Sequence, residues 1–158
     1  MKIALVLLAE ALGKMETSVY RERLYWLGMI LFLLGLLAGL ANPIFKNPRL
    51  GLSAHLEGVM NGMFLILVGL IWDRVRLSPK SQKLTFIFLI WAGYFNWLAC
   101  ALGGAFGASR MTPIAGGIFH AEAWQENLVA TLFGSVGVTM TIAAALLAWG
   151  LKPGLKKN

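Results

Sequence analysis

Charged residues and cysteine are scarce in this sequence of 158 residues. Asp, Glu, Lys and Arg together make up 13% of it, whereas hydrophobic residues make up 58% and the mean hydropathy is +0.72. Soluble domains carry about 25% charged residues, so the composition excludes an ordinary soluble protein and favours an integral membrane protein. The single cysteine, Cys100, lies in an apolar run. An internal disulfide is therefore excluded, and we expect a small buried side chain at this position.

Metal-binding motifs are missing as well. There are only two histidines, His55 and His120, and no HExxH, CxxC or CxxCH motif, which argues against a dedicated zinc site and against covalently attached haem. Acidic residues number 7 against 14 basic ones, which gives a net charge of +7. The basic residues stand at the edges of apolar runs without interleaved aromatic residues, so nucleic acid is not an expected partner. The charge instead indicates membrane topology.

Four apolar segments come close to the roughly 20 residues that a helix needs to cross the hydrocarbon core. They are Leu24–Ala41, Leu52–Trp72, Leu84–Leu102 and Leu128–Leu151. Backbone groups in lipid must be hydrogen-bonded internally, so each segment is predicted to be a helix. Prolines stand in the connectors, and the longest connector, 103–127, is a glycine-rich loop that can fold back over the bundle. The predicted fold is an all-α integral membrane protein with four transmembrane helices.

The distribution of lysine and arginine predicts the orientation of these helices. Of the 14 basic residues, only Lys46, Arg49 and Arg110 lie on one side, and the other eleven lie on the side that holds both termini. The positive-inside rule therefore predicts that both termini are cytoplasmic. His55, Asn61 and Asn96 then fall in the outer half of the bilayer, and the loop before the fourth helix is also outside.

The predicted domain comprises residues 24–151, preceded by an extension or cytoplasmic tail (1–23) and followed by a basic cytoplasmic tail (152–158). The apolar run in the first fourteen residues is too short to span a membrane and lacks a convincing cleavage site. Two expectations remain open for it. It lies on the membrane surface as an amphipathic segment, or translation starts at Met15.

Three polar residues interrupt the second apolar segment, and such residues usually face a bundle interior or a site. Neutral imidazole is the commonest metal ligand, so His55 is a candidate ligand of a metal or haem iron. The alternative is an interfacial histidine bonded to a backbone carbonyl or a lipid head group. Gly58 and Gly62 lie close to His55 around the predicted helix, so we expect a flat ligand to rest against these glycines.

Carboxylates and amides supply the other candidates. Glu57 and Asn61 share a helix face away from His55, where they can bond to each other, to another helix or to a substrate. Asn96 is open to the same interpretations. Glu126 stands before the fourth segment, where a carboxylate favours the positive end of a helix dipole or can transfer a proton. Pairs of glycines four apart favour close helix contacts and oligomerisation: Gly35 and Gly39, Gly58 and Gly62, Gly103 and Gly107.

The string NPRLGLSAHLEGVMNG at residues 47–62 is the most distinctive part of the sequence. With GLIW at 69–72, FNWLA at 95–99 and QENLVATLFG at 125–134, it resembles the hydroxylaminobenzene mutase family over residues 18–151. Members of that family are small bacterial membrane proteins that rearrange an aryl hydroxylamine to 2-aminophenol. The resemblance implies an isomerase that acts on a small aromatic hydroxylamine in nitroaromatic degradation.

A more distant resemblance reaches styrene oxide isomerase, a four-helix membrane enzyme that forms a trimer with haem b at its subunit interfaces. It implies a homotrimer, His55 as the axial ligand of haem b, and Asn61 and Asn96 as site residues. That family's aspartate falls on Ala92 and its tyrosine on Cys100, so two groups tied to epoxide chemistry are missing.

The resulting hypothesis is intramolecular hydroxyl transfer that converts hydroxylaminobenzene to 2-aminophenol, with ferric haem b as a Lewis acid. Asn61 and Asn96 orient the substrate or the migrating oxygen, and Glu57 or Glu126 transfers the proton lost from the ring. Two alternatives remain open. One is an epoxide isomerase, and the other is a non-catalytic haem-binding membrane subunit.

Overall fold

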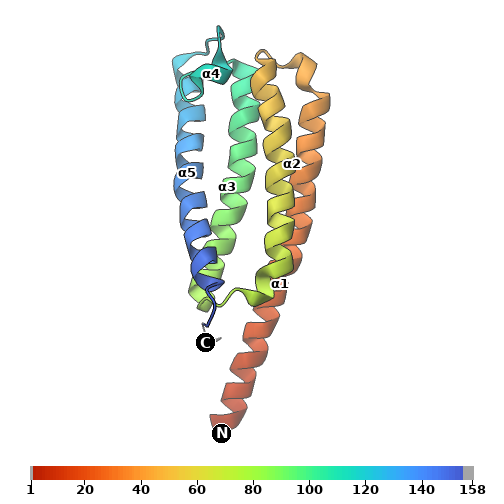
Figure 1. Cartoon of the computed structure of the whole chain (residues 1–158), viewed down its shortest axis with the longest axis vertical. Coiled ribbons are helices and arrows are strands. Elements are labelled where there is room, and N and C mark those ends of the chain that lie inside the picture. Colours follow the sequence, from red (N-terminus) through yellow and green to blue (C-terminus); the bar gives the residue numbers. More distant parts are fainter. Residues whose placement is uncertain (1, 155–158) are drawn as a thin grey trace.

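The computed structural model describes residues 2–154, with side chains from residue 18 onward. All the regular secondary structure in this part of the chain is helical (Figure 1). Two 3-10 turns, η1 (Asn42–Ile44) and η2 (Trp72–Arg74), follow the first two helices. The helices are α1 (Lys2–Leu40), α2 (Pro48–Ile71), α3 (Pro79–Phe106), the short α4 (Pro113–Gly116) and α5 (Ala123–Gly150). The predicted all-α fold is confirmed for the described residues.

Within the described residues, four helical stretches are long and apolar enough to cross a membrane: Ser18–Leu40, Pro48–Arg74, Pro79–Phe106 and Ala123–Gly150. They confirm the four predicted spans. However, the second, third and fourth spans begin at residues 48, 79 and 123 rather than at 52, 84 and 128. The difference arises because the first turn of a helix is polar and is fixed by capping rather than by apolar character. The Asn47 and Ser78 side chains cap α2 and α3, and a proline follows each of them.

Neighbouring helices pack in the order of the chain, with α1 beside α2, α2 beside α3, and α3 beside α5 (Figure 1). Glycines bring α1 and α2 into backbone contact. A Cβ atom on Gly35 would lie 2.5 Å from Val59 N, and one on Gly62 would lie 2.6 Å from Phe32 N. Any side chain at these positions would push the helices apart. The close approach predicted from glycine spacing is therefore confirmed for this helix pair.

The main hydrophobic core lies towards the end of the bundle that carries both chain ends. It joins α1, α2, α3 and α5 through fully buried side chains such as Leu31, Leu65, Leu89 and Ala143. Cys100 belongs to a smaller buried cluster with Ala38 and Ala54, as expected for this residue type. The described part of the chain thus has two apolar contact regions along one bundle.

The first residues of the chain extend α1 beyond the other helices (Figure 1). The backbone is helical from Lys2, so the predicted extension is continuous with the first span rather than a separate segment. Its placement on a membrane surface and the start at Met15 remain predictions. Of the predicted tail 152–158, residues 155–158 lie outside the described part.

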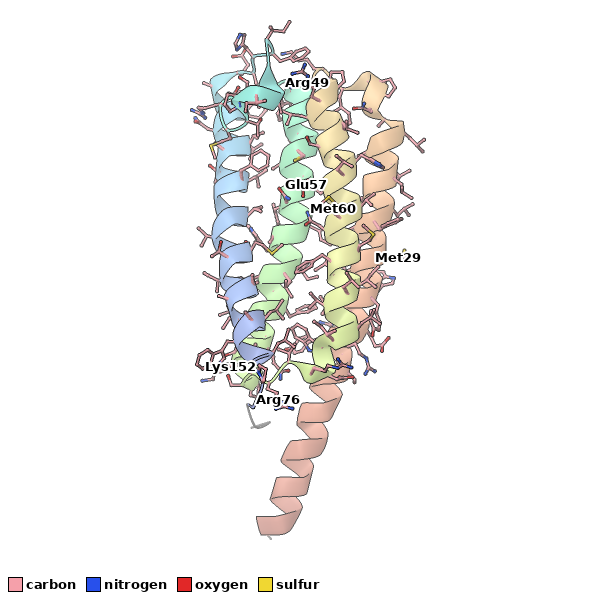
Figure 2. The ribbon with its side chains drawn as sticks, viewed as in Figure 1. Met29, Arg49, Glu57, Met60, Arg76 and Lys152 are labelled. Atoms are coloured by element: carbon pink, nitrogen blue, oxygen red, sulfur yellow. The ribbon has the colours of Figure 1, made fainter. Side chains whose placement is uncertain are left out.

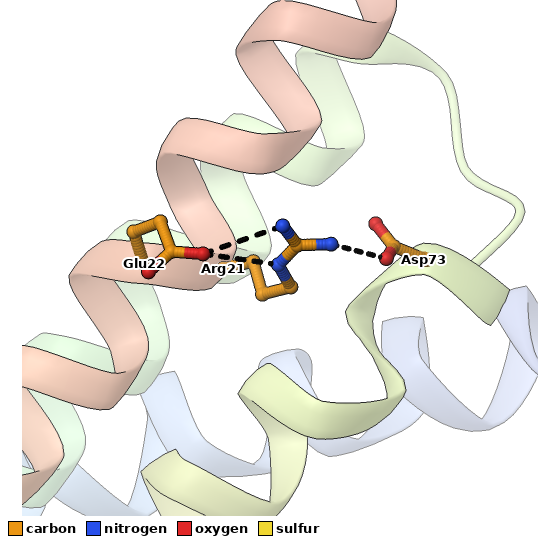
Figure 3. Close-up of polar contacts among 3 residues, drawn as sticks. All are labelled: Arg21, Glu22 and Asp73. Atoms are coloured by element: carbon orange, nitrogen blue, oxygen red, sulfur yellow. Dashed lines mark hydrogen bonds and ion pairs between the residues drawn. The ribbon is translucent and has the colours of Figure 1, made fainter.

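An ion pair ties α1 to the turn after α2 at the end where the extension leaves the bundle (Figure 3). Arg21 Nη1 lies 2.6 Å from Asp73 Oδ2, and the same guanidinium also contacts Glu22 Oε1 at 3.3 Å. All three side chains are solvent-accessible, so the pair adds little stability by itself. The ion pair does orient η2, because it holds Asp73 against α1.

Candidate functional site

A carboxylate and two amides meet between α2 and α3. Asn61 Nδ2 donates a hydrogen bond to Glu57 Oε2 at 3.1 Å, and Asn96 Nδ2 donates to the same oxygen at 2.5 Å. All three side chains are half-buried and lie within spanning segments. Both bonds use Oε2 of Glu57. Among the described residues, Oε1 has no hydrogen-bond partner, so it can bind another group. We call these three residues the Glu57 cluster.

The Glu57 cluster shows which of the possible partners Glu57 and Asn61 bind within the chain. Glu57 bonds both to Asn61, one turn away on its own helix, and to Asn96 on α3. Two donors on one oxygen fix the orientation of the carboxylate and of both amides. Figure 2 shows Glu57 along α2 between Arg49, at the end covered by α4, and Arg76, at the opposite end. The cluster is thus fixed between α2 and α3, where Oε2 accepts both hydrogen bonds.

The imidazole of His55 is held by the backbone of α1. His55 Nδ1 lies 2.9 Å from the carbonyl oxygen of Gly35. A carbonyl oxygen only accepts hydrogen bonds, so Nδ1 carries the proton in this contact. In a neutral ring Nε2 then keeps its lone pair, which is the form that binds a metal or haem iron. The carbonyl contact expected for a structural histidine is present, and it also prepares the ring for ligation.

Gly39 makes room for this imidazole. A Cβ atom on Gly39 would lie 2.6 Å from His55 Nδ1, 3.0 Å from Cγ and 3.2 Å from Cε1. Even alanine would therefore push the ring away from α1. Sequence reasoning singled out Gly39 only for helix packing, because the ring that it accommodates comes from another helix.

The interpretation of Gly58 and Gly62 as a cofactor seat is wrong. Both glycines are buried against α1. A Cβ atom on Gly58 would lie 2.4 Å from Gly35 Cα, and one on Gly62 would lie 2.7 Å from Gly28 O. The backbone of α1 occupies the space where a flat ligand was expected. A glycine face suits a ligand or a helix equally well, and in this chain it binds a helix.

Trp97 carries a buried donor beside this contact. Its Nε1 atom is buried and has no hydrogen-bond partner among the described residues. Its Cδ1 atom would lie 2.8 Å from a Cβ atom on Gly58, so the indole packs next to the residue that follows Glu57. A buried N–H without a partner costs about 1–3 kcal/mol, and such groups call for an explanation. This unpaired N–H was not predictable from the sequence, where Trp97 resembles an ordinary packing residue.

Glu126 does not join the Glu57 cluster. Its Oε1 accepts a hydrogen bond from Ser109 N at 2.9 Å, and its Oε2 accepts one from Arg110 N at 3.1 Å. The Arg110 side chain also donates to Asn127 Oδ1 at 2.6 Å. Glu126 thus joins the end of α3 to the start of α5, which agrees with the structural alternative for this residue.

Asn47 is the residue that sequence reasoning missed. It is 0% exposed. Its Nδ2 donates to Ala115 O at 2.9 Å, and its backbone N–H donates to Gly104 O at 2.9 Å. Its Oδ1 caps α2 by accepting from Arg49 N at 3.0 Å. Asn47 therefore holds the connector over the start of α2, which confirms that the connector folds back. The asparagine before a proline was the signal that could have identified it.

A groove with a volume of about 570 Å³ lies elsewhere, between α3 and α5. Its Trp91 indole already donates to Ser135 Oγ at 3.1 Å. None of the candidate residues lines this groove, which is formed by Ile87, Phe88, Trp91, Thr131, Gly134, Ser135, Val138 and Thr139. Among the described residues no group of three or more His, Cys, Asp or Glu side chains could hold a metal ion.

Four spanning helices with a carboxylate, two amides and a histidine inside them define a multi-pass membrane protein with a polar intramembrane site. The profile of the styrene oxide isomerase family matches residues 20–152, so the chain belongs to that family.

Two curated relatives are hydroxylaminobenzene mutases of Ectopseudomonas oleovorans. HabB is 48% identical over 132 residues, which cover 83% of this chain and 80% of HabB. HabA is 40% identical over 125 residues, which cover 78% of this chain and 93% of HabA. No solved structure matches the chain. The family and the relatives together identify the chain as an enzyme of the mutase and isomerase class.

Proposed function

We propose that this chain converts hydroxylaminobenzene to 2-aminophenol in the bacterial inner membrane. The two similar mutases support the substrate, and the Glu57 cluster is the observation that carries the proposal. The reaction breaks the N–O bond, forms a C–O bond at the ortho carbon, and moves one proton from that carbon to nitrogen. No net electrons or protons are exchanged. One carboxylate can therefore serve the whole reaction by accepting the ring proton and returning it.

Glu57 is the residue that we assign to this proton. Its Oε2 is bonded to Asn61 and Asn96, which leaves Oε1 to accept the proton. Each amide keeps a second N–H and its carbonyl oxygen, so both can also orient the substrate or the migrating oxygen. Glu126 is less suited to the role because each of its oxygens accepts a backbone N–H.

Haem b is the cofactor that we propose, and His55 would hold its iron through Nε2. The bond from Nδ1 to the Gly35 carbonyl supports this assignment, because it leaves the lone pair of Nε2 free. When bound, ferric haem supplies a Lewis acid that polarises the hydroxylamine oxygen. The apolar surroundings of the spans exclude water that would divert the reaction to the para product.

We also propose a homotrimer with both termini in the cytoplasm. Within the chain only 11% of the α5 span is buried. A Cβ atom on Gly134 or Gly137 would meet nothing within 4 Å, so these glycines leave room for a helix of a second copy. The count of three subunits rests on the resemblance to styrene oxide isomerase.

The function is tested by supplying hydroxylaminobenzene to membranes without a reductant and measuring 2-aminophenol. The His55→Ala variant is expected to lose both the haem absorption band and activity. Glu57→Gln is expected to keep the band but to lose activity by about 100-fold, whereas Glu126→Gln serves as the carboxylate control and stays active. Lack of 2-aminophenol from the wild type contradicts the function. Activity in haem-free His55→Ala protein contradicts only the cofactor.

An epoxide isomerase is the second candidate, favoured by the family match over residues 20–152. Ala92 and Cys100 argue against it, because neither supplies the carboxylate or phenol found in styrene oxide isomerase. Formation of an aldehyde from styrene oxide, at a rate above that with hydroxylaminobenzene, would favour this reading.

A further inference from the structure

Three isoleucines are nearly fully exposed at one end of the bundle. Ile44 in η1 is 85% exposed, Ile114 in α4 is 90% exposed, and Ile118 just beyond α4 is 87% exposed. They are the most exposed large hydrophobic side chains among the described residues. All three belong to the connectors at the end of the bundle covered by α4 (Figure 1). Single exposed apolar residues are ordinary, but three together at one end indicate a contact surface.

Hydrogen bonds hold the backbone that presents these side chains. Asn47 Nδ2 donates to Ala115 O at 2.9 Å, between two of the exposed isoleucines. Lys46 Nζ donates to His120 O at 2.7 Å and to Phe106 O at 3.1 Å, which fastens both ends of the connector. Exposure of Ile114 and Ile118 is therefore a fixed feature of the folded connector.

Basic residues surround the same end. Lys46, Arg49 and Arg110 are the only basic residues on this side of the spans, and all three are exposed. Figure 2 shows Arg49 directly beside α4. Of the two acidic residues nearby, Glu126 is bonded to two backbone N–H groups. Exposed apolar side chains next to cations are typical of surfaces that meet lipid head groups.

The helix lengths bring this end to the correct depth. Each of α3 and α5 has 28 residues, which at about 1.5 Å per residue gives about 42 Å. The hydrocarbon core is about 30 Å thick, which leaves about 6 Å of helix at each end. A connector at that depth lies in the head-group region, where apolar side chains reach the edge of the acyl chains.

We propose that Ile44, Ile114 and Ile118 insert into the head-group boundary of the nearer leaflet, while Arg49 and Arg110 contact phospholipid phosphates. The α4 end is thus a lipid-docking surface that keeps the connector against the bilayer. The inference concerns binding to lipid and is independent of the reaction proposed above.

Nitroxide labels test the proposal in the full-length protein. Cysteines are introduced singly as Ile44→Cys, Ile114→Cys and Ile118→Cys in a Cys100→Ala background, and each protein is reconstituted into vesicles of phosphatidylethanolamine and phosphatidylglycerol. Collision with oxygen and with a water-soluble nickel chelate reports the depth of each label. Leu67→Cys on the lipid-exposed part of α2 is the lipid reference, and Lys80→Cys at the opposite end is the aqueous reference. The three isoleucines are too exposed for their replacement to remove core packing.

We expect the oxygen-to-nickel ratio at the three labels to exceed that at Lys80 severalfold and to approach that at Leu67. Ratios equal to the one at Lys80 would overturn the proposal. Labels that neither reagent reaches, with spin–spin broadening, would show that a second copy covers this end, which also overturns it. The Arg49→Gln and Arg110→Gln variants should lower the ratio at Ile118→Cys in these vesicles and also in vesicles of phosphatidylcholine alone, because every one of these lipids carries a phosphate. An unchanged ratio in both kinds of vesicle would refute the phosphate contact.

Discussion

Gly39→Ala tests whether the α1 backbone positions His55. The new Cβ atom would lie 2.6 Å from His55 Nδ1. Ordinary contacts are about 3.5–4.0 Å, so the ring must move by about 1 Å. Such a shift away from α1 lengthens the 2.9 Å contact with Gly35 O beyond hydrogen-bond range. The substitution therefore removes the one bond that fixes the protonated nitrogen of the imidazole.

The expected change in the free energy of unfolding is the sum of two costs and one gain. Loss of the hydrogen bond costs about 0.5–1.5 kcal/mol, and overpacking costs about 1–3 kcal/mol. Alanine recovers up to about 1 kcal/mol because it favours helix more than glycine does. We therefore expect Gly39→Ala to lower the free energy of unfolding by about 0.5–4.5 kcal/mol. Activity should fall about 10–100-fold, because residues that orient a metal-binding histidine have effects of that size.

Gly103→Ala is the matched control, since it makes the same change in a spanning helix where the atom nearest to the new Cβ would be Leu50 Cδ1 at 3.1 Å, the end of a flexible side chain. Unfolding by sodium dodecyl sulfate in mixed micelles, followed by circular dichroism, compares the two stabilities, and the haem band and 2-aminophenol formation report the site. If Gly39→Ala matches Gly103→Ala in stability, in spectrum and in activity, the positioning of His55 by α1 is refuted.

Three further substitutions address other contacts. Asn47→Ala should lower the free energy of unfolding by about 2–4 kcal/mol, because it removes the cap of α2 and leaves buried carbonyls unpaired. Asn47→Asp keeps the cap, so its free energy of unfolding, measured by the same assay, should lie between those of Asn47→Ala and the wild type. If the unpartnered N–H of Trp97 binds substrate, Trp97→Phe should lower kcat/KM about tenfold at unchanged stability. Trp72→Phe removes another unpartnered N–H, just beyond the end of α2, and should leave kcat/KM unchanged. Glu126→Gln should speed amide exchange at Ser109 and Arg110 while activity stays within about threefold of the wild type. Equal exchange in both proteins would contradict its role in fastening the connector.

The spans were predictable because each depends on local composition. A run of apolar residues long enough to cross the bilayer must form a helix, whatever its neighbours are. Helix starts were not predictable from apolar character, since Asn47 and Ser78 define them through hydrogen bonds to the following turn. The fold of the connector depends on Asn47 as well, and its partners lie almost 70 residues further along the chain.

The candidate residues were predictable in kind but not in partnership. Polar residues in an apolar span are costly, which identified His55, Glu57 and Asn61 from the sequence. The sequence could not show that Asn96, 39 residues from Glu57, bonds to the same carboxylate oxygen. Nor could it show that Gly35 and Gly39 support the imidazole, because that contact depends on how α1 crosses α2.

The sequence alone thus determined the number of spans, their order and the few residues able to carry chemistry, since hydropathy and side-chain type are properties of each segment. Only the tertiary structure decided which helix face meets which neighbour. Gly58 and Gly62 could accept either a ligand or a helix, and the backbone of α1 fills the space beside them. That packing turns His55 towards the Gly35 carbonyl and leaves its other nitrogen free, because a helix contact fixes side-chain direction in a way that spacing along one helix cannot.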